Sequence, residues 1–107
     1  MDPQVAACIE ACNRAHGIAL GMAMNHCLET GGDHVEPKHF RLMGDCAAMC
    51  ATAADFMLRS SQFHADSCRL CADVCEACAD SCAGLDGMEP CIDACRACAA
   101  SCRAMAG

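Results

Sequence analysis

Small apolar side chains recur every three or four residues along most of the chain, with charged residues between them. In the segment CRLCADVCEACADSC, at positions 68–82, the five cysteines fall within an arc of roughly 80° on a helix that turns ~100° per residue. The charged residues of the segment fall outside that arc. The segment CIDACRACAASC, at 91–102, repeats the pattern. The spacing therefore predicts two amphipathic helices whose thiols face inward.

The same period continues through the rest of the chain and is interrupted at three turn-forming stretches, TGGDHVEP, RSSQF and AGLDGMEP. Asp2 and Pro3 are typical of a helix start, and Ser60 or Ser61 is suited to cap the third helix. The expected helices span residues 3–29, 37–59, 61–83 and 89–105. No strand pattern competes. Short connections between four helices predict an all-α, antiparallel up-down four-helix bundle with a cysteine-lined core, forming a single domain over residues 1–107.

The first two helices carry the same inner stripe with fewer thiols. The expected inner positions are Val5, Cys8, Cys12, Ala15, Ala19, Met22 and His26 in the first helix, and His39, Met43, Cys46, Cys50, Ala53 and Met57 in the second. With no Trp or Tyr and only three Phe, small and soft side chains must fill the interior. Six larger apolar side chains are expected to add burial without metal: Leu20, Leu28, Leu42, Phe40, Phe56 and Leu58.

Charge and cysteine content exclude several classes of protein. The formal charge of -7 and the scattered Lys and Arg residues argue against a nucleic-acid partner. The sequence contains no stretch of about 18 apolar residues, so no membrane span is predicted. The first residues lack the pattern of a secretory signal. A soluble, cytoplasmic protein is therefore expected. Fourteen cysteines at helix-face spacing, where neighbours would compete for partners, favour reduced thiols over a disulfide framework.

Cysteines four apart on a helix lie one above the other, so each CxxxC is a candidate two-thiolate clamp. The clamps are Cys8/Cys12, Cys46/Cys50, Cys71/Cys75, Cys78/Cys82, Cys91/Cys95 and Cys98/Cys102, with Cys68 extending the third helix and Cys27 lying apart. Soft thiolates favour Cu(I), Zn(II) or iron-sulfur clusters. Zn(II) prefers discrete four-ligand groups and clusters prefer loops, so continuous helical stripes favour multiple Cu(I) ions. A few buried cysteines usually mean packing only, and that would be the simpler interpretation of Cys27, or of Cys46 and Cys50, if they stood in isolation. For the whole set of fourteen, Cys27 included, we expect metal binding.

One end of the predicted bundle brings further soft ligands together. The end of the first helix and the start of the second share this mouth, where Met22, His26, Cys27, His39 and Met43 are expected near Cys82 and Cys91. We take His26, His39 and Met43 as candidate metal ligands for passing Cu(I) inward. Gap filling by methionine and capping by histidine are the competing explanations. His16, His34 and His64 are expected to be structural or exposed.

The segments CADVCEACADSC and CIDACRACAASC, preceded by DCAAMCATAADFMLRSSQFHADSCRLC, give residues 40–103 a clear resemblance to the bacterial copper storage proteins. The resemblance implies a Cys-lined four-helix bundle that stores and buffers Cu(I), a homotetramer, and the cytosolic branch of the family. The first helix departs from richer members, because Ala15, Ala19 and Met22 stand where cysteines could.

Two other classes of function remain as alternatives. A metal-responsive interaction or sensor module would need an exposed apolar patch, which the polar outer faces do not predict. An enzyme would need a nucleophile paired with a base or an open position on the metal, and neither is evident from the motifs. We therefore expect no catalytic activity.

Overall fold

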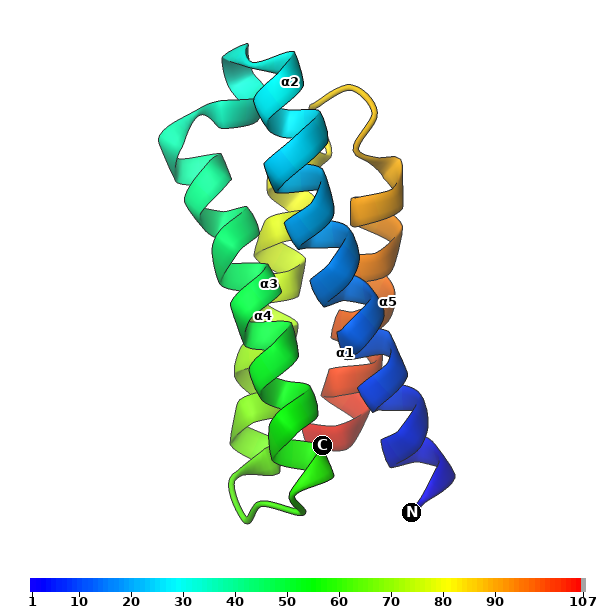
Figure 1. Cartoon of the computed structure of the whole chain (residues 1–107). Coiled ribbons are helices and arrows are strands. Elements are labelled where there is room, and N and C mark those ends of the chain that lie inside the picture. Colours follow the sequence, from blue (N-terminus) through cyan, green and yellow to red (C-terminus); the bar gives the residue numbers. More distant parts are fainter. Residues whose placement is uncertain (107) are drawn as a thin grey trace.

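The structure, a computed structural model, describes residues 1–106 as four long helices in an up-down arrangement (Figure 1). They are α1 (Pro3–Met22), α3 (Pro37–Leu58), α4 (His64–Cys82) and α5 (Glu89–Ala106), and α1 continues through a π-helical turn (Ala23–Cys27) into α2 (Leu28–Thr30). A 3-10 turn (Gly32–Val35) leads to α3. Helices α1 and α4 each pack against both α3 and α5, which gives a square bundle of 42 × 20 × 19 Å. The all-α bundle expected from the sequence is confirmed, with no strand in the described residues.

The helix starts follow local hydrogen bonding at α1 and α3. The Asp2 carboxylate accepts from the backbone N–H of Gln4 at 2.7 Å, and Pro3 occupies the first helical position, where no N–H is needed. The carboxylate of Glu36 caps α3 in the same way and accepts from the N–H groups of Lys38 and His39, both at 3.0 Å. These caps fix the residues at which α1 and α3 begin.

The third long helix starts at His64, later than the expected position 61. Ser60 has a φ of 53°, and Ser61 accepts from the N–H of Phe63 through its Oγ at 3.0 Å, so both serines lie in the turn. Phe63 at the N-cap makes no side-chain capping bond. The side chain of Ser61 binds a backbone N–H group within the turn, and neither serine caps α4. The helix is therefore about one turn shorter than expected.

The core consists almost entirely of cysteine, alanine and methionine side chains. Each of the fourteen cysteines is fully buried, and alanines fill the sites between neighbouring helices. The expected contribution of three leucines is wrong, because Leu20, Leu28 and Leu58 are 42%, 53% and 56% exposed. The inner stripe of each helix is already occupied by thiols and small residues, so the leucines point outward.

The π-helical turn at Ala23–Cys27 changes the inner face of the first helix. A π turn holds more residues than an α turn, so residues four apart stay in phase through it. Ala19, Ala23 and Cys27 are buried in succession, whereas Met22 and His26, expected inside, are only partly buried. The turn therefore moves Cys27 from the edge of the stripe into the core.

Candidate metal centre

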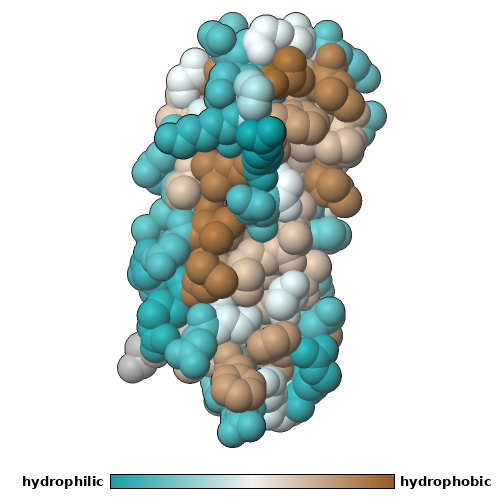
Figure 2. All heavy atoms as spheres, turned by 90° about the vertical axis from the view of Figure 1, so that its left-hand side faces the viewer, coloured by the Kyte–Doolittle hydropathy of each residue, from teal (hydrophilic) through white to brown (hydrophobic). Residues whose placement is uncertain are grey.

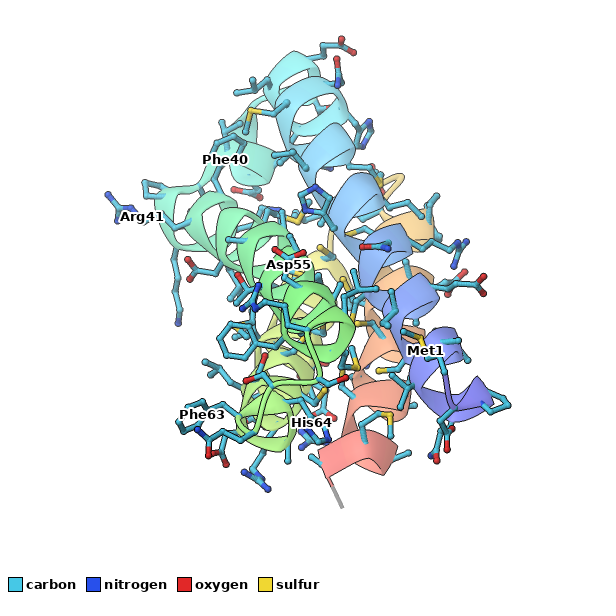
Figure 3. The ribbon with its side chains drawn as sticks, turned by 60° about the horizontal axis from the view of Figure 1, so that its bottom comes forward. Met1, Phe40, Arg41, Asp55, Phe63 and His64 are labelled. Carbon is cyan, nitrogen blue, oxygen red and sulfur yellow. The ribbon has the colours of Figure 1, made fainter. Side chains whose placement is uncertain are left out.

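All fourteen cysteines are free and buried, and thirteen of them form a continuous column of thiols along the bundle axis. Figure 3, viewed from the end that carries the chain termini, shows sulfur atoms gathered between the helices. Sulfur atoms from different helices approach closely: Cys50 and Cys75 are 3.4 Å apart, and Cys46 and Cys95 are 3.5 Å apart. Every cysteine that was singled out in the sequence lies in this core.

Thirteen of these thiols belong to five groups. Within each group the sulfur atoms all lie within 4.8 Å of one another. The groups are Cys8/Cys68/Cys102, Cys12/Cys71/Cys98/Cys102, Cys50/Cys71/Cys75/Cys98, Cys46/Cys78/Cys95 and Cys78/Cys82/Cys91. Adjacent groups share a cysteine, or are joined by the 3.9 Å contact of Cys46 with Cys75. Cys71 and Cys98 each belong to both four-thiol groups. The groups therefore merge into one line of sulfur ligands.

Met43 closes this line at the mouth, as the sequence predicted. Its Sδ accepts weak S–H hydrogen bonds from Cys78 at 3.6 Å, Cys82 at 3.5 Å and Cys91 at 4.0 Å. The side chain is fully buried. A thioether surrounded by three thiols is a soft site that can share a metal with them.

His39 lies at the same end with one nitrogen held and the other free. Its Nδ1 is 2.8 Å from Oγ of Ser81 on α4, and Nε2 is buried without a hydrogen-bond partner. Nε2 is therefore available to bind a metal ion at this end of the core. Ser81, which sequence reasoning missed, orients the ring. No motif in the sequence identifies Ser81, which precedes Cys82 and falls outside the cysteine spacing.

Of the other residues expected at the mouth, Met22 and His26 are only partly buried, whereas Cys27 lies in the core close to Cys82 and Cys91, as expected. Cys27 lies 3.9 Å from Sδ of Met88, a buried methionine that sequence reasoning also missed. Met88, Cys91 and Cys95 follow steps of three and four, a signal that could have identified it. His26 is not brought to the thiols, because its Nε2 lies 3.0 Å from the carbonyl oxygen of Asp86.

The remaining histidines each make a hydrogen bond to a backbone carbonyl oxygen. Nδ1 of His16 lies 2.8 Å from the carbonyl oxygen of Ala47, and Nε2 of the buried His34 lies 2.9 Å from that of Asp86. The rings of His26 and His34 meet edge to face, and both hold the α4–α5 loop in place through the carbonyl oxygen of Asp86. A further contact joins Nδ1 of His64 to the carbonyl oxygen of Ser61 at 2.9 Å.

The family model described as "Copper storage protein" matches residues 1–107, the whole chain. The chain belongs to the copper storage protein family. Its buried thiol groups are numerous enough to bind several metal ions. No curated protein matched the chain.

Solved structures agree with the family assignment. The protein Nmul_A1745 from Nitrosospira multiformis is 54% identical, with a TM-score of 0.97 over 99% of this chain and 97% of that one. The Cu(I)-bound copper storage protein BsCsp3 is 38% identical, with a TM-score of 0.89 over 97% and 99%. The apo form of copper storage protein 3 from Bacillus subtilis is also 38% identical, with a TM-score of 0.79 over 95% and 98%.

In this copper storage protein the neighbouring thiols differ in how readily they lose a proton. A hydrogen bond from Cys102 lowers the pKa of Cys8, and bonds from Cys50 and Cys75 lower the pKa of Cys46. Burial raises the pKa of Cys68 to about 11. Thiolates in the metal-free core are thus stabilised by S–H groups of their neighbours. Binding of copper must then displace the protons that the other thiols retain.

The raised pKa of Cys68 predicts that the metal-free copper storage protein is less stable in alkali. Below pH 9.0, the value for an unperturbed thiol, folded and unfolded chains both keep this proton and stability is complete. As the pH rises from 9.0 to about 11, the unfolded thiol ionises while the buried one does not, and the free energy of unfolding falls. Urea unfolding of the reduced protein, followed by circular dichroism across this range, measures the fall.

Two comparisons test the cause of the alkaline effect. Cys68→Ala should reduce the loss of stability, because it removes one buried group that resists ionisation. Copper loading should reduce it further, since a metal-bound thiolate has no proton to lose. An unfolding midpoint that is equally insensitive to pH in all three samples would contradict the expectation.

Proposed function

We propose that this chain stores multiple Cu(I) ions along its axis and buffers copper for the cell. The observation that carries the proposal is the line of merged thiol groups, in which Cys71 and Cys98 each serve two groups of four. Bridging thiolates can bind adjacent soft ions without a separate set of ligands for each. The Cu(I)-bound state of the relative BsCsp3 supports the choice of ion.

The charge of the ion supports Cu(I) over Zn(II). A buried thiolate is costly unless its charge is compensated. A singly charged ion replaces one proton, so a densely packed core can fill with ions while its net charge stays low. Zn(II) instead needs a closed tetrahedron of four ligands, which shared thiols cannot supply at every position. A Cu(I) titration of reduced protein against a competing chelator tests the assignment.

We further propose which residues bind the ions. All fourteen cysteines are assigned as thiolate ligands, and Met43 and His39 as additional ligands at the mouth. His26 is assigned a transient role, because it must first leave the carbonyl oxygen of Asp86. Cys27 lies outside the thiol groups and contacts the thioether of Met88. Burial raises its pKa, so this thiol is protonated until an ion arrives.

Replacing His39 by Gln should lower the affinity for the Cu(I) ion bound at the mouth and leave the rest of the titration unchanged. The substitution removes the free Nε2 while keeping a polar side chain near Ser81. Loss of a residue that merely supports a metal ligand weakens binding about 10- to 100-fold, so loss of the ligand atom should weaken it by at least as much. Chelator competition over the last equivalents of Cu(I) measures the change.

His16→Gln is the matched control for this substitution. The His16 ring also makes one hydrogen bond through Nδ1, but to the carbonyl of Ala47 and not beside a thiol group. Its titration should overlay that of the unchanged protein. If His39→Gln overlays it as well, His39 is a structural residue and not a ligand.

The proposal includes a homo-oligomer, a tetramer as the family resemblance implies. Leu20, Met24 and Leu28 are 42–53% exposed and follow one another at steps of four. A second apolar area, a groove of about 330 Å³ between α3 and α4, is lined by side chains that include Phe56, Phe63 and Leu70. Figure 2 shows hydrophobic residues gathered on this side of the molecule. The outer faces are thus less polar than the sequence predicted.

Contact with further copies of the chain would cover these surfaces, as in other assemblies with large apolar patches. Sedimentation velocity should give a mass of four chains, and a single-chain mass would contradict the proposal. The groove also keeps the alternative of a metal-responsive interaction module open. A partner that binds only the copper-loaded protein would favour that alternative.

A reducing compartment suits a core of free thiols, and we propose that the protein is cytoplasmic and has no catalytic activity. Within residues 1–106, no helix is long and apolar enough to cross a membrane. Ions enclosed by thiolates have no open position for a substrate. We also propose that residues 1–107 act as one domain, because a single core cluster joins all four long helices.

A further inference from the structure

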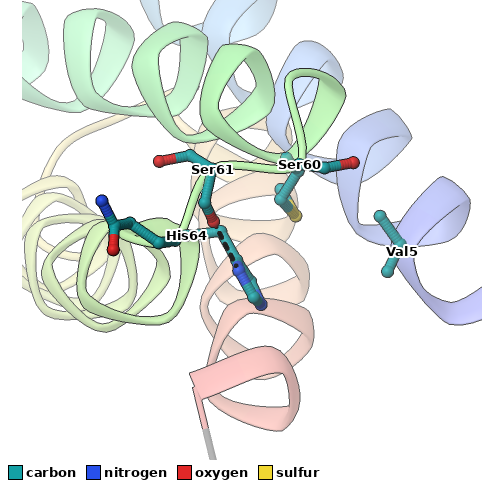
Figure 4. Close-up of a pocket in the computed structure, with 6 residues that line it drawn as sticks. Val5, Ser60, Ser61 and His64 are labelled. Atoms are coloured by element: carbon teal, nitrogen blue, oxygen red, sulfur yellow. Dashed lines mark hydrogen bonds between the residues drawn. The ribbon is translucent and has the colours of Figure 1, made fainter.

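A pocket of about 320 Å³ opens at the end of the bundle opposite the mouth. This end carries the N-terminus and the turn between α3 and α4 (Figures 1 and 3). The pocket is lined by Val5, Met57, Ser60, Ser61, Gln62 and His64 (Figure 4). The lining contains a thioether and an imidazole, two side chains that bind soft metal ions, and no carboxylate or cationic side chain.

The hydrogen bond of His64 determines which nitrogen is available to a metal. Nδ1 lies 2.9 Å from the carbonyl oxygen of Ser61, drawn as a dashed line in Figure 4. A carbonyl oxygen can only accept, so Nδ1 carries the proton. In the neutral ring Nε2 then has a free electron pair. This arrangement, in which a backbone carbonyl holds one nitrogen of the ring, is the usual one for histidines that bind metals.

The lining residues continue the inner stripes that carry the thiols. Met57, only 3% exposed, follows Cys50 and Ala53 on the inner face of α3. His64 precedes Cys68 by one turn of α4, a spacing that places the two side chains on the same face. Val5 stands just before Cys8 in the same way on α1. The pocket therefore adjoins the terminal thiol group Cys8/Cys68/Cys102.

We propose that Met57 and His64 form a Cu(I) site at a second port, through which the ion reaches Cys8, Cys68 and Cys102. The proposal rests on the copper storage function and adds a route at the opposite end of the core. The ion moves from two neutral ligands to thiolates and remains Cu(I). Each thiol that binds the ion releases its proton to water. The net charge of -7 attracts the cation to the protein as a whole.

The test uses full-length reduced protein and Cu(I) supplied as its weak acetonitrile complex. NMR of protein labelled with ¹⁵N in histidine and ¹³C in the methionine methyl groups follows both proposed ligands during the titration. We expect a large upfield shift of the His64 Nε2 signal, together with a shift of the Met57 methyl signal. His64→Gln should abolish most of the Met57 shift, which separates coordination from the mere proximity of filled thiols.

The kinetic part of the test compares two double variants by stopped flow. His64→Gln with Met57→Leu should take up Cu(I) at about half the original rate, because the mouth still admits ions. The control, His16→Gln with Met49→Leu, changes the same residue types away from both ends and should take up Cu(I) at the original rate. Circular dichroism verifies that both variants are folded.

Either an unmoved His64 Nε2 signal or an unchanged uptake rate overturns the proposal. The first result would show that His64 does not bind Cu(I), and the second would show that Cu(I) does not enter at this end. Storage itself is measured separately, since the number of tightly bound ions at the end of the titration should change by no more than about one in the His64/Met57 variant. Failure of the second port therefore leaves the storage function intact.

Discussion

Anaerobic titration of the reduced protein with Cu(I) should reach its end point only when many ions per chain are tightly bound, a number approaching the fourteen thiols. The reason is the continuity of the sulfur column, because adjacent groups share a cysteine or touch through Cys46 and Cys75. Each thiolate can bridge two ions, and each ion compensates one thiolate charge. A chromophoric Cu(I) chelator present in competition measures the number of ions it cannot remove.

A parallel Zn(II) titration provides the control for the metal. Four-ligand Zn(II) sites would use the thiols in sets, so no more than about three ions are expected per chain. Binding of one or two Cu(I) ions, or a preference for Zn(II), would contradict the storage function. The column would then be mainly core packing, and the function would shift towards a metal sensor.

The second large effect should follow from replacing Cys71 and Cys98 together by alanine. These two cysteines belong to both four-thiol groups, so their removal interrupts the column at its centre. Each group of four is reduced to two members, below the three ligands of the smallest groups found here. We expect the double variant to lose at least about three tightly bound Cu(I) ions, more than one for each thiol removed. The same chelator titration measures the loss.

A second pair of substitutions, Cys27→Ala with Cys68→Ala, removes the same number of thiols from less connected positions. Cys27 belongs to none of the groups, and Cys68 belongs to one. This variant should lose no more than about two ions. Both variants leave small cavities of similar size, so a comparable loss of stability is expected. Equal losses of copper from the two variants would show that the thiols act independently and that the groups do not merge.

The fold and most of the thiol column could be predicted because both depend on local periodicity. Cysteines at steps of three and four, separated by charged residues, place the thiols of α4 and α5 on one face whatever surrounds them. The caps at Asp2 and Glu36 and the glycine-containing turns then limit the chain to four antiparallel helices. The start of α4 was less predictable, since Ser60 and Ser61 suit a turn as well as a cap.

Predictions at the mouth were less complete because they depended on how the helix ends are wound. An uninterrupted α-helix would place Met22 and His26 inside, whereas the π turn buries Ala23 and Cys27 instead. The sequence contains no pattern that identifies such a turn. The position of Met88 could have been found from its spacing to Cys91, but it was assigned to the preceding loop.

The amino-acid sequence by itself determined the helices, the face of each helix that carries thiols, and therefore the soft-metal chemistry of the core. It did so because the side-chain period of a helix is a local property. Only the tertiary structure decided which thiols meet across helices, that Cys71 and Cys98 join two groups, and that Nε2 of His39 remains free beside them. These contacts depend on the axial register and winding of four packed helices, which arise from packing throughout the bundle and from no single segment.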